Sequence, residues 1–108
     1  MNVLSNNNIK SETGINALKE VMDPEIGLNI VDLGLVYELN FDEENKTVNL
    51  LMTLTTQYCP MGESICNSAK NKLETAFEGY IANVELVFDP PWTFESLSEE
   101  GRRFLGRI

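Results

Sequence analysis

The chain has 108 residues, 43% of them hydrophobic and 23% charged, which is typical of one globular domain and excludes extensive disorder. Its 17 acidic and 8 basic residues leave a net charge of −9, a field that repels phosphate backbones and argues against a nucleic-acid partner. No apolar run approaches the roughly 20 residues of a membrane-spanning helix, so we expect no membrane partner.

The N-terminal stretch MNVLSNNNIKSE has neither the basic region nor the apolar region of a secretory signal. The chain also has only two cysteines, which do not make the disulfide framework of a small secreted protein. We therefore expect a cytoplasmic protein.

The first predicted element is a helix. Residues 1–10 are polar and rich in asparagine, and we expect a flexible lead-in there, before a single domain of residues 11–108. Ser11 is suited to cap a helix. The apolar residues that follow recur at helical spacing and predict a buried stripe of Ile15, Leu18, Val21 and Met22. Pro24 ends this helix, because the residue before a proline avoids the α region.

A turn over residues 23–27 and a β-hairpin come next. Residues 35–41 alternate with the period of a half-buried strand, which places on one face Leu35, Tyr37, Leu39 and Phe41. Residues 42–46 supply a polar turn. The second strand covers residues 47–54, and its buried face is expected to consist of Val48, Leu50, Met52 and Leu54.

The longest predicted helix covers residues 61–77, and Pro60 suits its first position. Its apolar spacing predicts a buried stripe of Ile65, Ala69, Leu73, Ala76 and Phe77, with Cys66 beside it. Gly79 closes the helix, and a third strand follows over residues 81–88. The prolines at 90 and 91 stop that strand. A short C-terminal helix is expected to begin near Ser98 and to carry Phe104 and Leu105.

The predicted element order is α-β-β-α-β-α, which indicates a small two-layer fold of the α+β class. The hairpin is antiparallel. The third strand joins the sheet after a crossover helix, and we expect that connection to be right-handed.

Cys59 is the candidate chemical centre that remains once other kinds of catalytic and binding site are excluded. The chain has no histidine, which removes Ser-His-Asp and Cys-His catalysis and histidine metal sites, and it has no glycine-rich phosphate loop. Cys59 precedes Pro60, so we expect it at the N-cap of the long helix. Backbone N–H groups and the helix dipole favour a thiolate there, which predicts a modestly activated thiol. A small buried cap residue is the alternative interpretation of the same position.

The second cysteine, Cys66, lies seven residues further on, which is about 10.5 Å along a helix. Two helical cysteines so far apart can neither form a disulfide nor easily share one metal ion. We therefore predict that Cys66 is a small core residue.

Several other polar or aromatic residues have a structural interpretation. Asp23 and Glu25 flank Pro24, so neither is expected to point into the core, and ordinary turn chemistry is the alternative to a functional role. Asp32 is expected to make a cap or turn hydrogen bond. Trp92 is expected to be a packing anchor.

Four motifs occur together in order and spacing. They are Asp23-Pro24-Glu25, the run of residues 29–37, residues 52–56 followed by Cys59-Pro60, and residues 89–93. With these motifs the chain closely resembles the MIP18 family, also called the domain of unknown function 59 family, over roughly residues 15–105. That family includes the iron–sulfur maturation factor of bacterial Suf systems and the phenylacetate-degradation protein of the PaaD type.

The resemblance implies the family's iron–sulfur-cluster-assembly type of α+β fold and a role in maturing or delivering iron–sulfur clusters. It implies a functional surface of Asp23, Glu25, Thr55, Thr56 and Cys59, with Cys59 as the metal ligand. The implied cofactor is a transient iron–sulfur cluster or iron, with none permanently bound. The implied partners are iron–sulfur scaffold or client proteins. A second copy of this chain, which would form a homodimer, is a further candidate partner.

Ligand counting leads to the same class of function. A typical cluster needs four thiolates, whereas this chain offers one accessible cysteine and no histidine. We therefore expect transient holding at an interface or handover to a partner, without enzymatic activity. Two alternatives stay open, namely a non-metal adaptor subunit of a multisubunit enzyme such as a PaaD-like oxygenase component, and a thiol-dependent enzyme.

Overall fold

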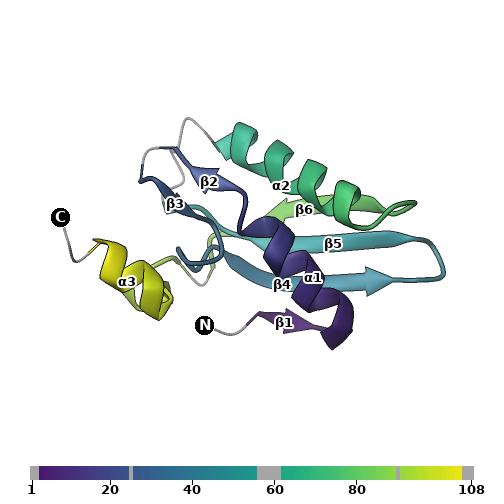
Figure 1. The fold of residues 1–108 in the computed structure, drawn as a ribbon, viewed down its shortest axis with the longest axis horizontal. Coiled ribbons are helices and arrows are strands. Elements are labelled where there is room, and N and C mark those ends of the chain that lie inside the picture. Colours follow the sequence, from purple (N-terminus) through teal and green to yellow (C-terminus); the bar gives the residue numbers. More distant parts are fainter. Residues whose placement is uncertain (1–2, 25, 56–61, 90, 106–108) are drawn as a thin grey trace.

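A four-stranded sheet forms the centre of the protein in a computed structural model that describes residues 3–24, 26–55, 62–89 and 91–105 (Figure 1). In spatial order the strands are β1 (Leu4–Ser5), β4 (Val36–Asp42), β5 (Thr47–Met52) and β6 (Ile81–Leu86). β4 and β5 form the predicted antiparallel hairpin, whereas β1 and β6 run parallel to their neighbours.

Two helices, α1 (Asn8–Leu18) and α2 (Gly62–Ala76), cover one face of this sheet (Figure 1). They contact each other, while α1 also contacts β4 and α2 contacts β6. Because α2 links β5 to its parallel neighbour β6, it is the crossover helix that such a pair requires. The predicted α+β class and its two layers are confirmed.

Smaller elements lie at the end of the sheet where β5 ends, opposite the hairpin turn (Figure 1). They are the antiparallel ribbon of β2 (Met22–Asp23) and β3 (Leu28–Asn29), the 3-10 turn η1 (Phe94–Ser96) and α3 (Glu99–Leu105). Two-residue strands carry no periodic signal, so the sequence did not predict them. No helix among the described residues has the length and apolarity to span a membrane.

The core lies between the sheet and the two helices. Alternate residues of β5 and its extension are buried as predicted, namely Val48, Leu50, Met52 and Leu54. The predicted stripe of α2 is also confirmed, with Ile65, Ala69, Leu73 and Phe77 buried and Ala76 packed against them. Hydrophobic burial of these two patterns brings the helix layer onto the sheet.

The N-terminal segment differs from the prediction. Leu4 and Ser5 form β1, and α1 begins at Asn8, so part of the expected lead-in belongs to the fold. The cap of α1 is Asn7, whose side chain accepts a hydrogen bond from the N–H of Lys10 at 3.0 Å. The prediction that Ser11 caps the helix was wrong, because Ser11 lies buried within it.

The first helix also ends earlier than predicted. α1 stops at Leu18, and Met22 lies in β2, where its side chain is 50% exposed. Met22 pairs with Asn29 of β3, and the N–H of Ile30 donates to the carbonyl of Val21 at 2.9 Å. These non-local bonds compete successfully with one further helical turn, which has only local support.

A β-bulge interrupts β4. The pairing register with β5 shifts between Val36 and Glu38, so Tyr37 is an extra residue in the strand. Val36 takes the buried position opposite Met52, and Tyr37 is half-buried. The predicted alternation was therefore wrong for these two residues, because a bulge breaks the period of two.

Candidate functional site

A chain of backbone hydrogen bonds connects the β2–β3 ribbon to the end of β5. The N–H of Ile30 bonds to the carbonyl of Val21, and the N–H of Leu35 donates to the carbonyl of Ile30 at 3.0 Å. The N–H of Thr53, the residue after β5, donates to the carbonyl of Leu35 at 2.8 Å. The segment after α1, the segment before β4 and the segment after β5 are thus held together at one end of the sheet.

Asp23 belongs to this end of the sheet and is buried. It is the last residue of β2, it pairs with Leu28, and it is 2% exposed. The expected turn is present after it, because the N–H of Gly27 donates to the carbonyl of Asp23 at 2.7 Å and Gly27 adopts a φ of +81°. The expectation that Asp23 points away from the core was wrong, because strand pairing turns the residue inward.

Thr55 lies near the start of α2. Thr55 itself is half-buried, whereas the preceding Leu54 is buried and packs closely on Gly62, the first residue of α2. A Cβ atom at Gly62 would lie 2.8 Å from Cδ1 of Leu54. The two ends of the connection that contains Cys59 are therefore close together.

Three predicted site residues, Glu25, Thr56 and Cys59, lie outside the described residues. Their roles stay predictions. The structure brings together the chain segments on either side of them, with Asp23 and Thr55 as the described members of the expected surface.

Cys66 is half-buried on α2, beside the buried stripe as predicted but without complete burial. Burial raises the pKa of its thiol, so at neutral pH the group is protonated. Since the thiolate is the metal-binding form, Cys66 is a poor ligand.

The sequence did not predict that two hydroxyl groups, those of Tyr37 and Thr53, lie together near the end of β5. Burial raises the pKa of the Tyr37 hydroxyl, and a hydrogen bond with Thr53 opposes that rise. Thr53 is fully buried. The position of Thr53 between two buried apolar residues was the pattern that could have indicated its burial. The position of Tyr37 depends on a β-bulge, which the alternation of strand residues does not predict.

The C-terminal segment is fastened to the same end of the sheet through Asp32. Ser98 Oγ donates to Asp32 Oδ1 at 2.8 Å, and Asn29 Nδ2 donates to Asp32 Oδ2 at 2.7 Å. Trp92, packed against the core, donates from Nε1 to the carbonyl of Leu33 at 2.5 Å. The predicted cap or turn role of Asp32 and the packing role of Trp92 are confirmed.

The described residues do not form a metal centre of their own. Over residues 3–24, 26–55, 62–89 and 91–105, no three cysteine, aspartate or glutamate side chains lie close enough to hold one metal ion. An iron-binding set at this end of the sheet would therefore include residues beyond these ranges or residues of a partner.

These features define a small α+β protein in which the ribbon with the buried Asp23 is joined to the end of β5, and the residue before Thr55 packs on the start of the long helix. The family model described as "Iron-sulfur cluster assembly protein" matches residues 15–86, and the chain belongs to this family. The resemblance to the domain of unknown function 59 family is thereby confirmed.

Similar proteins cover nearly the whole chain. The Fe-S protein maturation auxiliary factor YitW of Bacillus subtilis (strain 168) is 39% identical over 88% of this chain and 92% of its own length. The Fe-S protein maturation auxiliary factor SufT of Staphylococcus aureus (strain USA300) is 42% identical over 80% and 97%, respectively. The crystal structure of a DUF59 domain from Bacillus anthracis superposes with a TM-score of 0.87 at 34% identity, covering 94% of this chain and 95% of that one.

Proposed function

We propose that this protein is a non-enzymatic auxiliary factor of iron–sulfur cluster maturation, which holds a cluster or iron transiently through Cys59 and passes it to a client protein. The observation that carries the proposal is that Leu54 packs on Gly62, so the two chain segments that flank Cys59, the one ending at Thr55 and the start of α2, lie close together. The β2–β3 ribbon that contains Asp23 is joined by backbone hydrogen bonds to the same end of the sheet. Two relatives named Fe-S protein maturation auxiliary factors support it.

The donor set favours handover over permanent binding. A typical cluster takes four thiolates, and the chain contains two cysteines and no histidine. Cys66 is half-buried, and burial raises the pKa of its thiol, so Cys59 is the better ligand. The remaining ligands would come from a scaffold or client protein, or from a second copy of this chain, and an incomplete set releases its cargo readily.

The other members of the expected surface have supporting roles in the proposal. Glu25 contributes a carboxylate that contacts iron or the partner, and the carboxylate of Asp23, which is 2% exposed, acts within the site and not on the partner surface. Thr55 and Thr56 supply hydroxyl groups that hydrogen-bond near the sulfur. The place of action that we propose is the cytoplasm, where thiols stay reduced.

Client activation tests the proposal. Cells that lack this protein are complemented with the wild type, Cys59→Ala or Cys66→Ala, and the activity of an iron–sulfur enzyme is measured. We expect Cys59→Ala to lower client activation at least about tenfold, because loss of a ligand should cost no less than the roughly 10- to 100-fold effect of changing an outer-shell partner of a metal ligand. Cys66→Ala is the matched control and should activate the client as the wild type does.

Anaerobic reconstitution of the purified variants with iron and sulfide, followed by absorption and native mass spectrometry, provides the second measurement. Iron and sulfide bound by the wild type and by Cys66→Ala, but not by Cys59→Ala, would support the proposal. Full client activation by Cys59→Ala would overturn it. If Cys59→Ala still formed stable complexes with the client protein and no variant bound iron, these results would instead favour the adaptor role.

A further inference from the structure

The face of the sheet opposite α1 and α2 carries a groove. Neighbouring residues of β4, β5 and β6 line it, and its volume is about 430 Å³. The side chains that alternate outward into it are Glu38, Asn40, Asn49, Leu51, Asn83 and Glu85, which we call the outer face. Asn49, Asn83 and Glu85 are exposed and the other three are half-buried, so the described part of the chain leaves this face open to solvent.

The outer face is organised in rows across the three strands. Glu38, Leu51 and Glu85 are successive partners in the register and form one row. Asn40, Asn49 and Asn83 form the next row, in which Asn83 Nδ2 donates to Asn49 Oδ1 at 3.2 Å. Each row therefore presents polar groups at regular strand spacing.

The charge of this face has one sign. β4, β5 and β6 contain no lysine or arginine, so no basic residue of these strands neutralises Glu38 or Glu85. Strands lie about 4.8 Å apart, which puts the backbones of Glu38 and Glu85 about 10 Å from each other, with Leu51 between them. A single metal ion does not fit carboxylates at that separation as well as two cationic side chains do.

The geometry and charge of the outer face favour a peptide segment with basic side chains. A lysine or arginine can lay its alkyl stem over Leu51 and reach a carboxylate of Glu38 or Glu85 with its charged end. The amide row offers acceptors and donors to the backbone of the same bound segment. Nucleic acid, an anionic membrane or a second copy of this chain, whose net charge is −9, would be repelled.

We propose that the outer face docks an extended basic segment of the protein that receives or supplies the cluster. The identity of this partner rests on the proposed function, whereas the affinity for basic peptide does not. The row of Leu51 lies four residues before Thr55, about 13 Å along an extended chain. A segment bound there would hold its protein next to the end of the sheet that carries the candidate site.

The probe for this surface is a short peptide of alternating lysine and serine, which displays its lysines on one side when extended. In amide-resolved NMR titrations at about 0.15 M salt, we expect the shifts to concentrate on the outer-face residues. Glu38→Gln/Glu85→Gln should weaken binding by about 2- to 30-fold, the effect of two exposed ion pairs. A peptide with glutamate in place of lysine should cause no shifts.

The matched control is Glu12→Gln/Glu78→Gln, which removes the same charge from two exposed positions elsewhere. Its affinity should stay within about twofold of the wild type, because salt screens distant charges. Equal weakening in both double variants, or shifts spread over all acidic residues, would overturn the proposal. Circular dichroism verifies that both variants are folded.

Client activation separates this proposal from the proposed function. Peptide binding at the outer face together with full activation by Cys59→Ala would refute the cluster role and keep the docking face. Loss of activation in Cys59→Ala with no peptide binding by the wild type would refute the docking face and keep the cluster role.

Discussion

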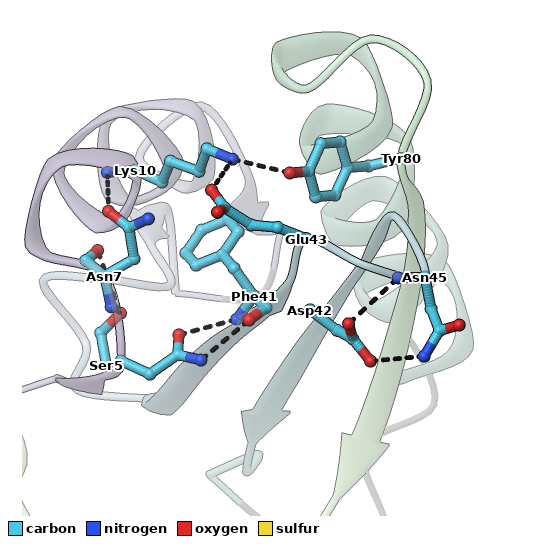
Figure 2. Close-up of polar contacts among 9 residues, drawn as sticks. Ser5, Asn7, Lys10, Phe41, Asp42, Glu43, Asn45 and Tyr80 are labelled. Carbon is cyan, nitrogen blue, oxygen red and sulfur yellow. Dashed lines mark hydrogen bonds and ion pairs between the residues drawn. The ribbon is translucent and has the colours of Figure 1, made fainter.

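The two ends of the sheet are held by different kinds of polar contact. At the hairpin end, Lys10 donates to Glu43 Oε1 at 2.5 Å and to the Tyr80 hydroxyl at 2.6 Å, which joins α1, the β4–β5 turn and the segment after α2 (Figure 2). The side chains of Lys10 and Glu43 are 29% and 61% exposed. Water competes for such groups, so exposed ion pairs contribute little free energy.

The opposite end depends on more enclosed contacts with short side chains. Asp32 accepts from Asn29 and Ser98, and Trp92 donates to the carbonyl of Leu33, all in partly buried surroundings. If a substitution removes one side of such a hydrogen bond, the donor or acceptor that remains has no bonding partner and only restricted access to water. The end that carries the candidate site is thus the more precisely specified of the two, and the hairpin end should tolerate more change.

Gly34→Ala should give the largest effect in this comparison. Gly34 has a φ of +78°, and an added Cβ would lie 1.9 Å from the backbone oxygen of Ser96. The C-terminal segment would have to move, so we expect the free energy of unfolding to fall by about 3 kcal/mol or more. Urea denaturation followed by circular dichroism measures this loss.

Gly79→Ala is the control for backbone conformation alone. Gly79 has a φ of +87° with no neighbouring atom within 4 Å of an added Cβ, so only the left-handed strain applies, about 1–2 kcal/mol. Equal losses in the two variants would contradict the close packing of the C-terminal segment on Gly34.

Asp32→Ala should have an intermediate effect. The change removes the acceptor of Ser98 Oγ and Asn29 Nδ2, and we expect a loss of about 1–3 kcal/mol in the free energy of unfolding. The matched variant at the hairpin end is Asp42→Ala, because Asp42 also accepts two bonds, both from the exposed Asn45. Asp42→Ala should cost less than about 1 kcal/mol. A larger cost at Asp42 than at Asp32 would reverse the comparison.

Glu43→Gln should have the smallest effect on stability, and this effect should be measurable at acidic pH. The hydrogen bond from Lys10 and its positive charge lower the pKa of Glu43 below the ordinary value of 4.5. A lowered pKa in the folded state gives a stabilisation that is present above pH 4.5 and is lost as the pH falls through the folded-state value. Glu43→Gln removes this contribution, so its melting temperature should fall less steeply than that of the wild type below pH 4.5.

The exposed Glu44 of the same turn provides the control for that experiment. Glu44→Gln should keep the acid dependence of the wild type, since the contact between Lys10 and Glu43 is intact. Melting curves of Glu43→Gln that parallel those of the wild type from pH 7 to pH 3 would contradict a stabilising pair.

Elements with strong local patterns were predictable, including the hairpin, α2 and the C-terminal helix that begins after Ser98. The candidate site was predictable in part. The motifs indicated Asp23 and Thr55, and the structure places the segments of both at one end of the sheet. The burial of Asp23 was missed because strand pairing with Leu28 is a non-local event that no local period encodes.

The amino-acid sequence by itself determined the buried faces of β5 and α2, because apolar spacing of 2 or 3.6 follows directly from strand and helix geometry. It also limited the chemistry, since two cysteines and no histidine fall short of the four thiolates that a typical cluster takes. Only the tertiary structure decided where α1 stops, where β4 bulges and how the C-terminal segment is fastened to Asp32. Those features depend on hydrogen bonds between residues distant in the chain, whose free energy exceeds the small local preferences that they override.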